Sequence, residues 1–225
     1  MIDKTHAMNI QHQLYSGTLI SFEGIDGAGK STHIPFFAQE IGKHFPDKNI
    51  VLTREPGGTE LGEKLRQYLL NEPMDIRTEA LLMFASRQEH LTQLIEPALR
   101  NGDIVITDRF TDSSFAYQCG GRGLAIADLE LMEKWVQTRK VGEQSELLEP
   151  KITFLFDLTP DIAQKRRSAS RNPDKFEELD LEFFNRVRNE YLRRASLAPE
   201  RFIVIDSSLD IQSIQDQLKK CIASL

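Results

Sequence analysis

The stretch Gly24-Ile25-Asp26-Gly27-Ala28-Gly29-Lys30-Ser31 decides the fold of this 225-residue chain. It follows a short apolar run, Thr18-Leu19-Ile20-Ser21-Phe22, and opens a segment with helical spacing from Ser31 to His44. The spacing is that of a P-loop, in the strand–loop–helix context that this motif requires. Its glycines let successive backbone N–H groups point inward at a polyphosphate, and the helix N-terminus adds partial positive charge. The sequence therefore predicts a nucleotide site.

Each residue of this loop has a predicted part in binding ATP. We expect Lys30 to be an exposed loop side chain that reaches the β- and γ-phosphates, and the Ser31 hydroxyl to ligate Mg²⁺. The predicted ATP-binding residues are Gly24, Ile25, Asp26, Gly27, Ala28, Gly29, Lys30, Ser31 and Thr32.

Short apolar runs alternate with longer helical patterns along the rest of the chain. The strand candidates are residues 18–22, 50–53, 104–107, 152–156 and 202–205, and the helix candidates are residues 31–44, 79–101, 127–139, 181–195 and 211–224. The strand candidates are rich in β-branched and aromatic residues, as is typical of strands buried on both faces of a parallel sheet. Alternating strands and helices predict an α/β fold of right-handed βαβ units, here with the P-loop NTPase arrangement.

One domain accounts for the whole pattern. We predict a flexible N-terminal extension at residues 1–16, a domain over residues 17–225 and a lid at about residues 165–176, where the sequence is polar and basic. The helix candidate at residues 79–101 carries a repeated apolar pattern and ends at Asn101-Gly102, a typical left-handed stop. The apolar positions are Leu81, Leu82, Ala85, Leu91, Leu94, Ile95 and Leu99.

Composition argues against several classes of partner. The formal net charge of −6 offers no long-range attraction to nucleic acid, so any bound phosphate needs a local pocket. The two cysteines, Cys119 and Cys221, are too few for a disulfide framework and suit a reducing compartment. Residues 1–15 lack the apolar core of a signal peptide, and no apolar run approaches the ~20 residues of a membrane span. We expect a cytoplasmic protein with neither a nucleic-acid nor a membrane partner.

The strand candidate at residues 104–107 leads into Asp108-Arg109. An acid at this place corresponds to the metal-side acid of P-loop enzymes, and the arginine can grip a phosphate with two parallel hydrogen bonds. No Asn-Lys-x-Asp segment follows the P-loop, which argues against a guanine-nucleotide switch. The sequence predicts a second phosphate site at this edge of the sheet, where ligands bind in open α/β folds.

Three segments together resemble the thymidylate kinase family, bacterial type, from Leu19 to about Leu218. They are FEGIDGAGKST at residues 22–32, TREPGGT at residues 53–59 and DRFTDSSFAYQCGGRG at residues 108–123. The first occurs in P-loop enzymes generally, whereas the second and third are specific to this family. The resemblance implies a five-stranded parallel sheet flanked by helices with a short lid. It also implies transfer of the γ-phosphoryl group of ATP to dTMP, with Mg²⁺ on the ATP phosphates, and a homodimer.

The resemblance implies roles for residues around the reacting phosphates. Asp26 corresponds to the acid that contacts the sugar 3′-hydroxyl of the acceptor. Arg54 and Arg109 correspond to a clamp on the acceptor phosphate. Glu55 and Asp108 resemble acids near Mg²⁺ and the reacting phosphates. The metal ligands expected are Ser31 and Asp108.

The resemblance also implies how the base is held. Arg87 and Gln118 match residues that contact the pyrimidine edge, where their donors and acceptors suit O4 and N3 of thymine. Phe84 is the candidate for stacking on the base, with Met83 as the alternative one residue away, and Tyr117 matches a ring that disfavours ribonucleotides. The acceptor-binding residues implied are Asp26, Arg54, Glu55, Phe84, Arg87, Arg109, Ser113, Ser114, Tyr117 and Gln118.

Position 27 departs from one branch of the family, in which an arginine stands where this chain has Gly27. We therefore expect a lid arginine to neutralise the charge of the transferring phosphoryl group, with Arg171 favoured and Arg166 or Arg167 as substitutes. The catalytic residues implied are Lys30, Asp108, Arg109 and Arg171.

Two other functions remain open from the sequence alone. A kinase for another acceptor, either a different nucleoside monophosphate or a deoxynucleoside, would share most of these residues. A nucleotide-binding switch or regulatory module would share the P-loop, but it has no need of Lys30, Asp108, Arg109 and the lid arginines together.

Overall fold

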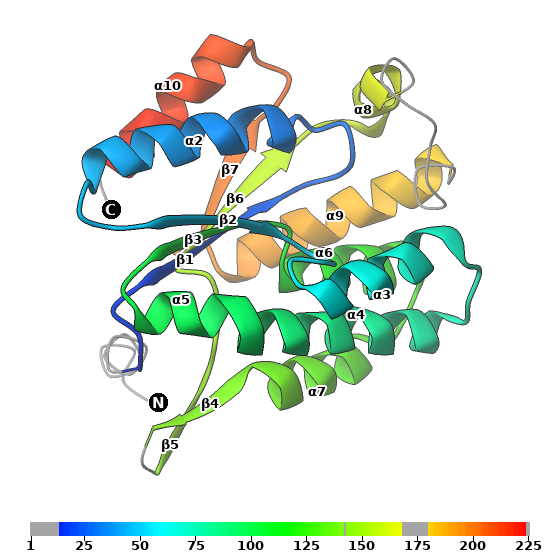
Figure 1. The fold of residues 1–225 in the computed structure, drawn as a ribbon. Helices are drawn as coiled ribbons and strands as arrows, with labels where there is room; N and C mark the ends of the chain where they lie inside the picture. Colours follow the sequence, from blue (N-terminus) through cyan, green and yellow to red (C-terminus); the bar gives the residue numbers. More distant parts are fainter. Residues whose placement is uncertain (1–13, 142, 168–179, 224–225) are drawn as a thin grey trace.

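Five parallel strands form the centre of the fold, in a computed structural model that describes residues 14–141, 143–167 and 180–223 (Figure 1). The strands are β1 (Thr18–Glu23), β2 (Ile50–Arg54), β3 (Ile104–Asp108), β6 (Ile152–Asp157) and β7 (Phe202–Asp206). Their order across the sheet is β2-β3-β1-β6-β7, and every neighbouring pair is parallel. All five predicted strands are confirmed, each one residue longer at its carboxyl end than predicted.

Helices cover both faces of this sheet. On one face α2 and α10 lie side by side, and on the other lie α4, α5 and α9, with α7 outermost beside α4 (Figure 1). The Phe37 ring of α2 packs against Phe22 of β1 with ring centroids 5.3 Å apart, and both rings are fully buried. The helices are α2 (Lys30–His44), α3 (Glu60–Asn71), α4 (Ile76–His90), η1 (Leu91–Ile95, a π-helical turn), α5 (Glu96–Arg100), α6 (Thr111–Ser114), η2 (Phe115–Gly121, also π-helical), α7 (Ile126–Gln137), α8 (Pro160–Arg167), α9 (Leu181–Leu197) and α10 (Ile211–Ile222).

The long helix expected at residues 79–101 exists, but its buried face differs from the predicted one. It begins three residues earlier, where the Asp75 side chain accepts a hydrogen bond from the Arg77 N–H. In α4 the core-facing residues are Ala80 and Phe84, whereas Leu81 is 56% exposed. The apolar pattern that includes Leu81 is therefore wrong for the first half of this helix, because part of the buried face there is polar and includes Glu79.

The ordered domain begins earlier than predicted. Tyr15, assigned to the flexible extension, is 5% exposed, and its hydroxyl donates a 3.0 Å hydrogen bond to Glu96 Oε2. Tyr15 packs with the domain core although polar residues surround it in the sequence, so the predicted boundary lies too far along the chain. Residues 1–13, and residues 168–179 of the predicted lid, lie outside the described residues.

A small antiparallel hairpin was not predicted. Helix α7 ends at Gln137, two residues before its expected end, and β4 (Thr138–Val141) then pairs with β5 (Gln144–Leu147). The hairpin projects from the lower left of the molecule in Figure 1.

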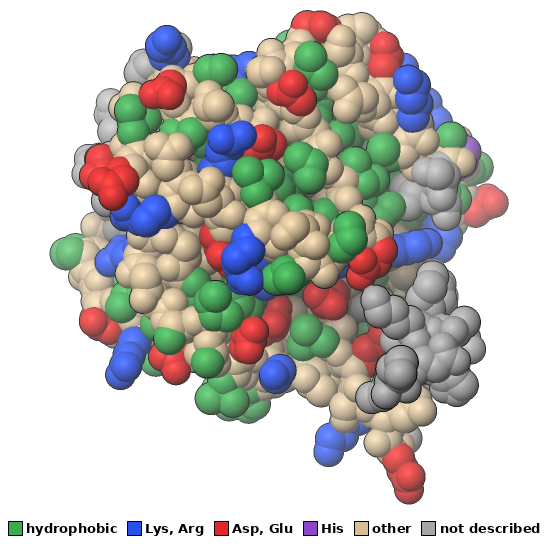
Figure 2. Space-filling view, turned by 180° about the vertical axis from the view of Figure 1, so that it is seen from behind, with side chains coloured by type: hydrophobic (Ala, Val, Ile, Leu, Met, Phe, Trp, Pro, Cys, Tyr) green, Lys and Arg blue, Asp and Glu red, His purple; other side chains and the backbone are tan. Residues whose placement is uncertain are grey.

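The surface seen from behind is a mixture of charges. Lysine, arginine, aspartate and glutamate side chains are interspersed among apolar ones over that face (Figure 2). Among the described residues, no helix has the length and apolar character needed to cross a membrane.

The register of the sheet brings three functional loops to one edge. Asp108 at the end of β3 is the Cα partner of Phe22 in β1 and of Arg54 in β2. The P-loop, the segment after Arg54 and the segment after Asp108 therefore leave the sheet side by side, at the carboxyl ends of parallel strands.

Candidate functional site

The P-loop connects β1 to α2 through a backbone that requires glycine. Gly24 has φ 133°, and a Cβ there would lie 2.4 Å from the carbonyl oxygen of Phe156. Gly27 has φ 85°, a left-handed conformation in which an arginine side chain would be strained. Both positions therefore have a backbone conformation that glycine adopts most readily.

Lys30 is buried rather than exposed as predicted, with 6% of its surface accessible. Its Nζ donates to the Gly24 carbonyl oxygen at 3.0 Å and lies 4.0 Å from Asp108 Oδ1. Burial and the nearby Arg109 charge lower the pKa of Lys30, and the carboxylates of Asp108 and Asp26 oppose that shift. The ammonium is thus held at the loop before any phosphate arrives.

Ser31 and Asp108 line the same open groove, beside the start of α2. Asp108 Oδ1 is buried and has no hydrogen-bond partner. Mg²⁺ at nucleotide sites commonly takes only one or two protein oxygens, the rest of its shell being phosphate and water. A hydroxyl and a carboxylate oxygen without a hydrogen-bond partner, both beside a P-loop, therefore fit this ion.

A second open groove lies on the other side of the loop. It is lined by Ala28, Gly29, Thr32 and, from α8, Arg166. The Arg166 Nη2 donates to the carbonyl oxygen of Ser207 at 3.1 Å, which fixes this arginine beside the P-loop. Arg171 lies outside the described residues, as do Ser168 to Ser170, and the side chain of Arg167 is not described.

Arg109 joins the P-loop to the segment after β3. Its φ of 71° is left-handed, which is rare for a residue with a side chain and marks a functional constraint. Its guanidinium donates to Asp26 Oδ1 at 2.8 Å, to the Tyr117 hydroxyl at 3.2 Å and to the Gly24 carbonyl oxygen at 3.0 Å. Tyr117 in turn donates to Asp26 Oδ2 at 2.9 Å. Burial alone would raise the pKa of Asp26, but the charges of Arg109 and Lys30 outweigh it and lower that pKa.

Behind Arg109 lies a buried carboxylate that the sequence analysis missed. Glu23, fully buried at the end of β1, accepts from the Phe110 N–H at 2.7 Å, from the Ser113 hydroxyl at 2.6 Å and from the Tyr191 hydroxyl at 3.1 Å. Burial, reinforced by the charge of Asp112, raises the pKa of Glu23 to about 7. Ser113 and Tyr191 also accept hydrogen bonds from Arg109, so this group helps to hold the arginine in place.

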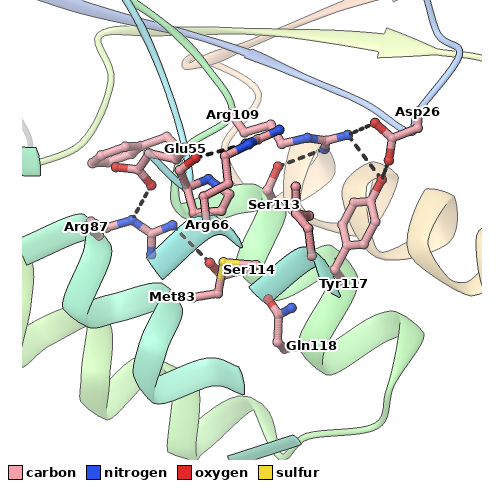
Figure 3. A pocket seen from close by; sticks show the side chains of 13 residues that line it. Asp26, Glu55, Arg66, Met83, Arg87, Arg109, Ser113, Ser114, Tyr117 and Gln118 are labelled. Atoms are coloured by element: carbon pink, nitrogen blue, oxygen red, sulfur yellow. Dashed lines mark hydrogen bonds and ion pairs between the residues drawn. The ribbon is translucent and has the colours of Figure 1, made fainter. Parts of the chain in front are cut away.

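A cavity opens beside Arg109 (Figure 3). In that view Arg109 and Asp26 lie at the top, and Met83 and Gln118 lie below them. The cavity brings together every predicted acceptor residue except Arg54 and Phe84. Its lining is Asp26, Glu55, Pro56, Arg66, Leu70, Met83, Arg87, Arg109, Phe110, Ser113, Ser114, Tyr117 and Gln118.

Arg87 is fixed at the side of this cavity by a buried network. Its Nε donates to Glu55 Oε2 at 2.7 Å, and its Nη2 donates to the Ser114 hydroxyl at 2.9 Å. The other oxygen of Glu55 contacts His90 Nδ1 at 3.0 Å, so both carboxylate oxygens are engaged. Burial raises the pKa of Glu55, but Arg87 and His90 outweigh it and lower that pKa. Both carboxylate oxygens of Glu55 are thus bonded to side chains of α4, and one of these contacts holds Arg87 in place.

Two polar atoms of this cavity are buried without a hydrogen-bond partner. They are the donor Arg87 Nη1 and the acceptor Gln118 Oε1. A buried unpaired polar group is costly and is expected to have a ligand, water or ion as its partner.

Two predicted residues lie elsewhere. Phe84 is in the core, with the Arg87 guanidinium 4.7 Å from its ring centroid, while its neighbour Met83 lines the cavity. Arg54 is exposed, pairs with Glu63 at 2.9 Å and lines the groove of Ser31 and Asp108. In its place Arg66 of α3, which no sequence motif marks, lines the cavity.

Comparisons with known proteins agree over almost the full length. A family model described as thymidylate kinase matches residues 22–218. Thymidylate kinases from Burkholderia lata and Ralstonia nicotianae are each 54% identical over 212 residues, which cover 93% of this chain and 99% and 100% of those relatives. The crystal structure of thymidylate kinase from Ehrlichia chaffeensis superposes with a TM-score of 0.72 at 32% identity, covering 92% of this chain and 98% of that one.

Proposed function

The chain belongs to the thymidylate kinase family, and we propose that the cavity beside Arg109 is the site at which it holds dTMP. It is a nucleoside monophosphate kinase that transfers the γ-phosphoryl group of ATP to dTMP, giving dTDP and ADP. The assignments of residues to substrates and metal below are part of the proposal.

The observation that carries the proposal is the pair of unpartnered atoms in the cavity. Arg87 Nη1 can only donate, and Gln118 Oε1 can only accept. Thymine presents an acceptor at O4 and a donor at N3–H, so its edge satisfies both atoms. Cytosine presents an amino donor in place of O4 and an acceptor at N3, and leaves both unpaired.

Substrate discrimination tests this assignment. We expect the kcat/KM for dTMP to exceed that for dCMP by about 10⁴-fold, because a site built for hydrogen bonds strongly rejects an analogue that leaves them unmade. The acceptor dUMP keeps the thymine edge and lacks one methyl group, so its loss should be limited to about 10- to 200-fold. Equal efficiency with dCMP would rule out this contact pattern.

The acceptor phosphate needs cations in the same cavity. Three arginines line it: Arg87, which is assigned to the base, and Arg66 and Arg109, which are left for the phosphate. Arg66 Nη1 donates to the Pro56 carbonyl oxygen at 2.9 Å. Burial and the nearby charges of Arg54 and Arg109 lower the pKa of Arg66, as expected where positive charge is concentrated. We assign the clamp to Arg66 and Arg109 in place of the predicted pair that included Arg54. Met83 is assigned to the face of the base, since Phe84 is in the core.

On the donor side, we assign the P-loop amides and Lys30 to the ATP phosphates, and Ser31 and Asp108 would hold Mg²⁺. When bound, this ion would supply positive charge to the ATP phosphates. The acceptor is already an oxyanion and needs no strong base, so this chain contributes positioning and charge neutralisation. Arg109 contacts the P-loop and lines the acceptor cavity, so the proposal assigns to it the alignment of the donor and acceptor phosphates.

A lid arginine remains the proposed source of charge that Gly27 does not supply. We expect Arg171→Ala to lower kcat with little change in the KM for dTMP, because a contact made only in the transition state affects kcat. Arg166→Ala should instead raise the KM for ATP, since Arg166 already lines the P-loop groove. Steady-state kinetics of the single variants at 166, 167 and 171 distinguish these effects. Normal kcat in all three, and in the triple variant, would exclude a catalytic lid.

We also propose that the chain forms a homodimer through its exposed apolar helix faces. On α7 Trp135 is 82% and Leu131 is 70% exposed, one helical turn apart, and Leu81 of the neighbouring α4 is 56% exposed. Such exposure is unusual unless another molecule covers it. Light scattering should report a dimer for the native chain and a monomer for Trp135→Glu. A native monomer would exclude this interface.

The cytoplasmic location expected from composition stays a prediction.

A further inference from the structure

The base-reading amide of Gln118 has a carboxylate on its far side. Gln118 Nε2 donates to Glu79 Oε1 at 3.0 Å, and the two side chains are 1% and 0% exposed. Glu79 lies on α4 and Gln118 lies on η2, so the contact joins two walls of the cavity. Glu79 itself is not among the residues that line the cavity.

This contact decides which atom of the amide faces the acceptor. An ionised carboxylate only accepts hydrogen bonds, so it admits the NH₂ end of Gln118 and repels the oxygen end. Rotation of the amide by half a turn would bring Gln118 Oε1 next to Glu79 Oε1. Two acceptor oxygens would then face each other in the buried interior without a hydrogen between them. The observed orientation, with Oε1 toward the cavity, follows directly from the charge behind it.

Arg122 supplies the counter-charge for this buried carboxylate. Its Nη1 lies 2.8 Å from Glu79 Oε2, the oxygen that does not face Gln118. Arg122 is part-exposed, with 29% of its side chain accessible, whereas Glu79 is fully buried. A buried ion pair adds little to stability compared with apolar packing, so stability alone does not account for a charge at this place.

We propose that Glu79, paired with Arg122, is a specificity-determining positioning residue that holds the Gln118 amide ready to accept N3–H of thymine and unable to donate to N3 of cytosine. The inference rests on the proposed acceptor site. It adds that discrimination between thymine and cytosine at N3 depends on Glu79, which does not contact the base, as well as on Gln118, which does.

The test replaces the carboxylate with an amide of the same shape. In Glu79→Gln the new side chain can offer either its oxygen or its NH₂, so the Gln118 amide has a partner in both orientations. The two acceptors are dTMP and 5-methyl-dCMP, which differ only at the hydrogen-bonding edge. We expect the ratio of their kcat/KM values to fall by about 10- to 100-fold, with an absolute rise in kcat/KM for 5-methyl-dCMP, since one buried mismatch is relieved. The mismatch at Arg87 remains, so discrimination is reduced rather than abolished.

The rise for 5-methyl-dCMP separates positioning from a merely structural role. Damage to the cavity would lower the efficiency with both acceptors and leave their ratio near that of the native enzyme, and this result would overturn the inference. Glu79→Asp keeps an acceptor-only group, so it should keep the native preference even if overall efficiency falls. A preference relaxed as far in Glu79→Asp as in Glu79→Gln would also overturn it.

Glu96→Gln is the matched control. Glu96 is another buried glutamate, 6% exposed, which pairs with Arg100 and Arg139 away from the cavity. The ratio of the kcat/KM values for dTMP and 5-methyl-dCMP in Glu96→Gln should equal that of the native enzyme. If circular dichroism shows that Glu79→Gln is unfolded, the double variant Glu79→Gln/Arg122→Gln removes the uncompensated cation and is judged by the same ratio. A native enzyme that fails to distinguish the two acceptors would instead overturn the proposed base contacts, and the inference with them.

Discussion

Lys30→Met is expected to lower kcat by about 10³-fold while leaving a folded protein, an estimate based on the loss of a preorganised charge at a transferring phosphoryl group. Lys30 already lies at the loop, with its Nζ bonded to the Gly24 carbonyl and 4.0 Å from Asp108. A cation held in this way needs little rearrangement to follow charge onto the moving group. The measurement is steady-state turnover with saturating ATP and dTMP.

The burial of Lys30 determines the choice of substitution and of control. Methionine fills the space of the lysine stem, whereas alanine would leave a cavity under the P-loop. Lys43→Met, on the same helix α2 but with 62% of its side chain exposed, is the matched control and should keep normal turnover. Circular dichroism and thermal unfolding report the fold of both. Near-normal turnover in folded Lys30→Met would remove the P-loop lysine from the mechanism.

Arg109→Lys is expected to lower kcat/KM for dTMP by about 10²- to 10³-fold, although it preserves the charge. A lysine offers a compact ammonium in place of the planar guanidinium group of arginine. Its three donors leave from a single nitrogen, which cannot take the place of the two nitrogens through which Arg109 reaches Gly24 and Asp26. Both the link between donor and acceptor sites and the phosphate clamp would be weakened, so kcat should fall along with a rise in KM.

A second arginine provides the control for that substitution. Arg139 forms a buried ion pair with Glu96 near the β4–β5 hairpin, outside the cavity and both grooves. Arg139→Lys should change stability slightly and kcat/KM hardly at all. If Arg109→Lys behaves like Arg139→Lys, Arg109 is only a structural tie between two loops.

The sheet and the P-loop were predictable because their signals are local. A P-loop motif contains its own strand end, turn and helix start, and buried parallel strands consist of continuous apolar runs. The stop at Gly102 was also local, since its φ of 86° is the left-handed conformation that glycine favours. Local rules failed where polar residues form a buried face, as in α4, where Phe84 and Arg87 face inward and Leu81 faces outward.

The parts of the site that were missed depend on contacts between distant segments. Tyr191 resembles an ordinary core residue of α9, yet its hydroxyl meets Glu23, 168 positions away, behind Arg109. Arg66 belongs to an amphipathic helix without a motif, and only the packing of α3 against α4 brings it to the cavity. A basic residue on the helix that follows a phosphate-binding segment is the one signal that could have marked it.

The most direct test of the account is a crystal structure with dTMP bound. We expect thymine O4 within hydrogen-bonding distance of Arg87 Nη1, N3 within hydrogen-bonding distance of Gln118 Oε1, and the acceptor phosphate between Arg66 and Arg109. A base bound elsewhere, or bound here with Arg87 Nη1 and Gln118 Oε1 still unpartnered, would contradict the central claim that this cavity reads the thymine edge.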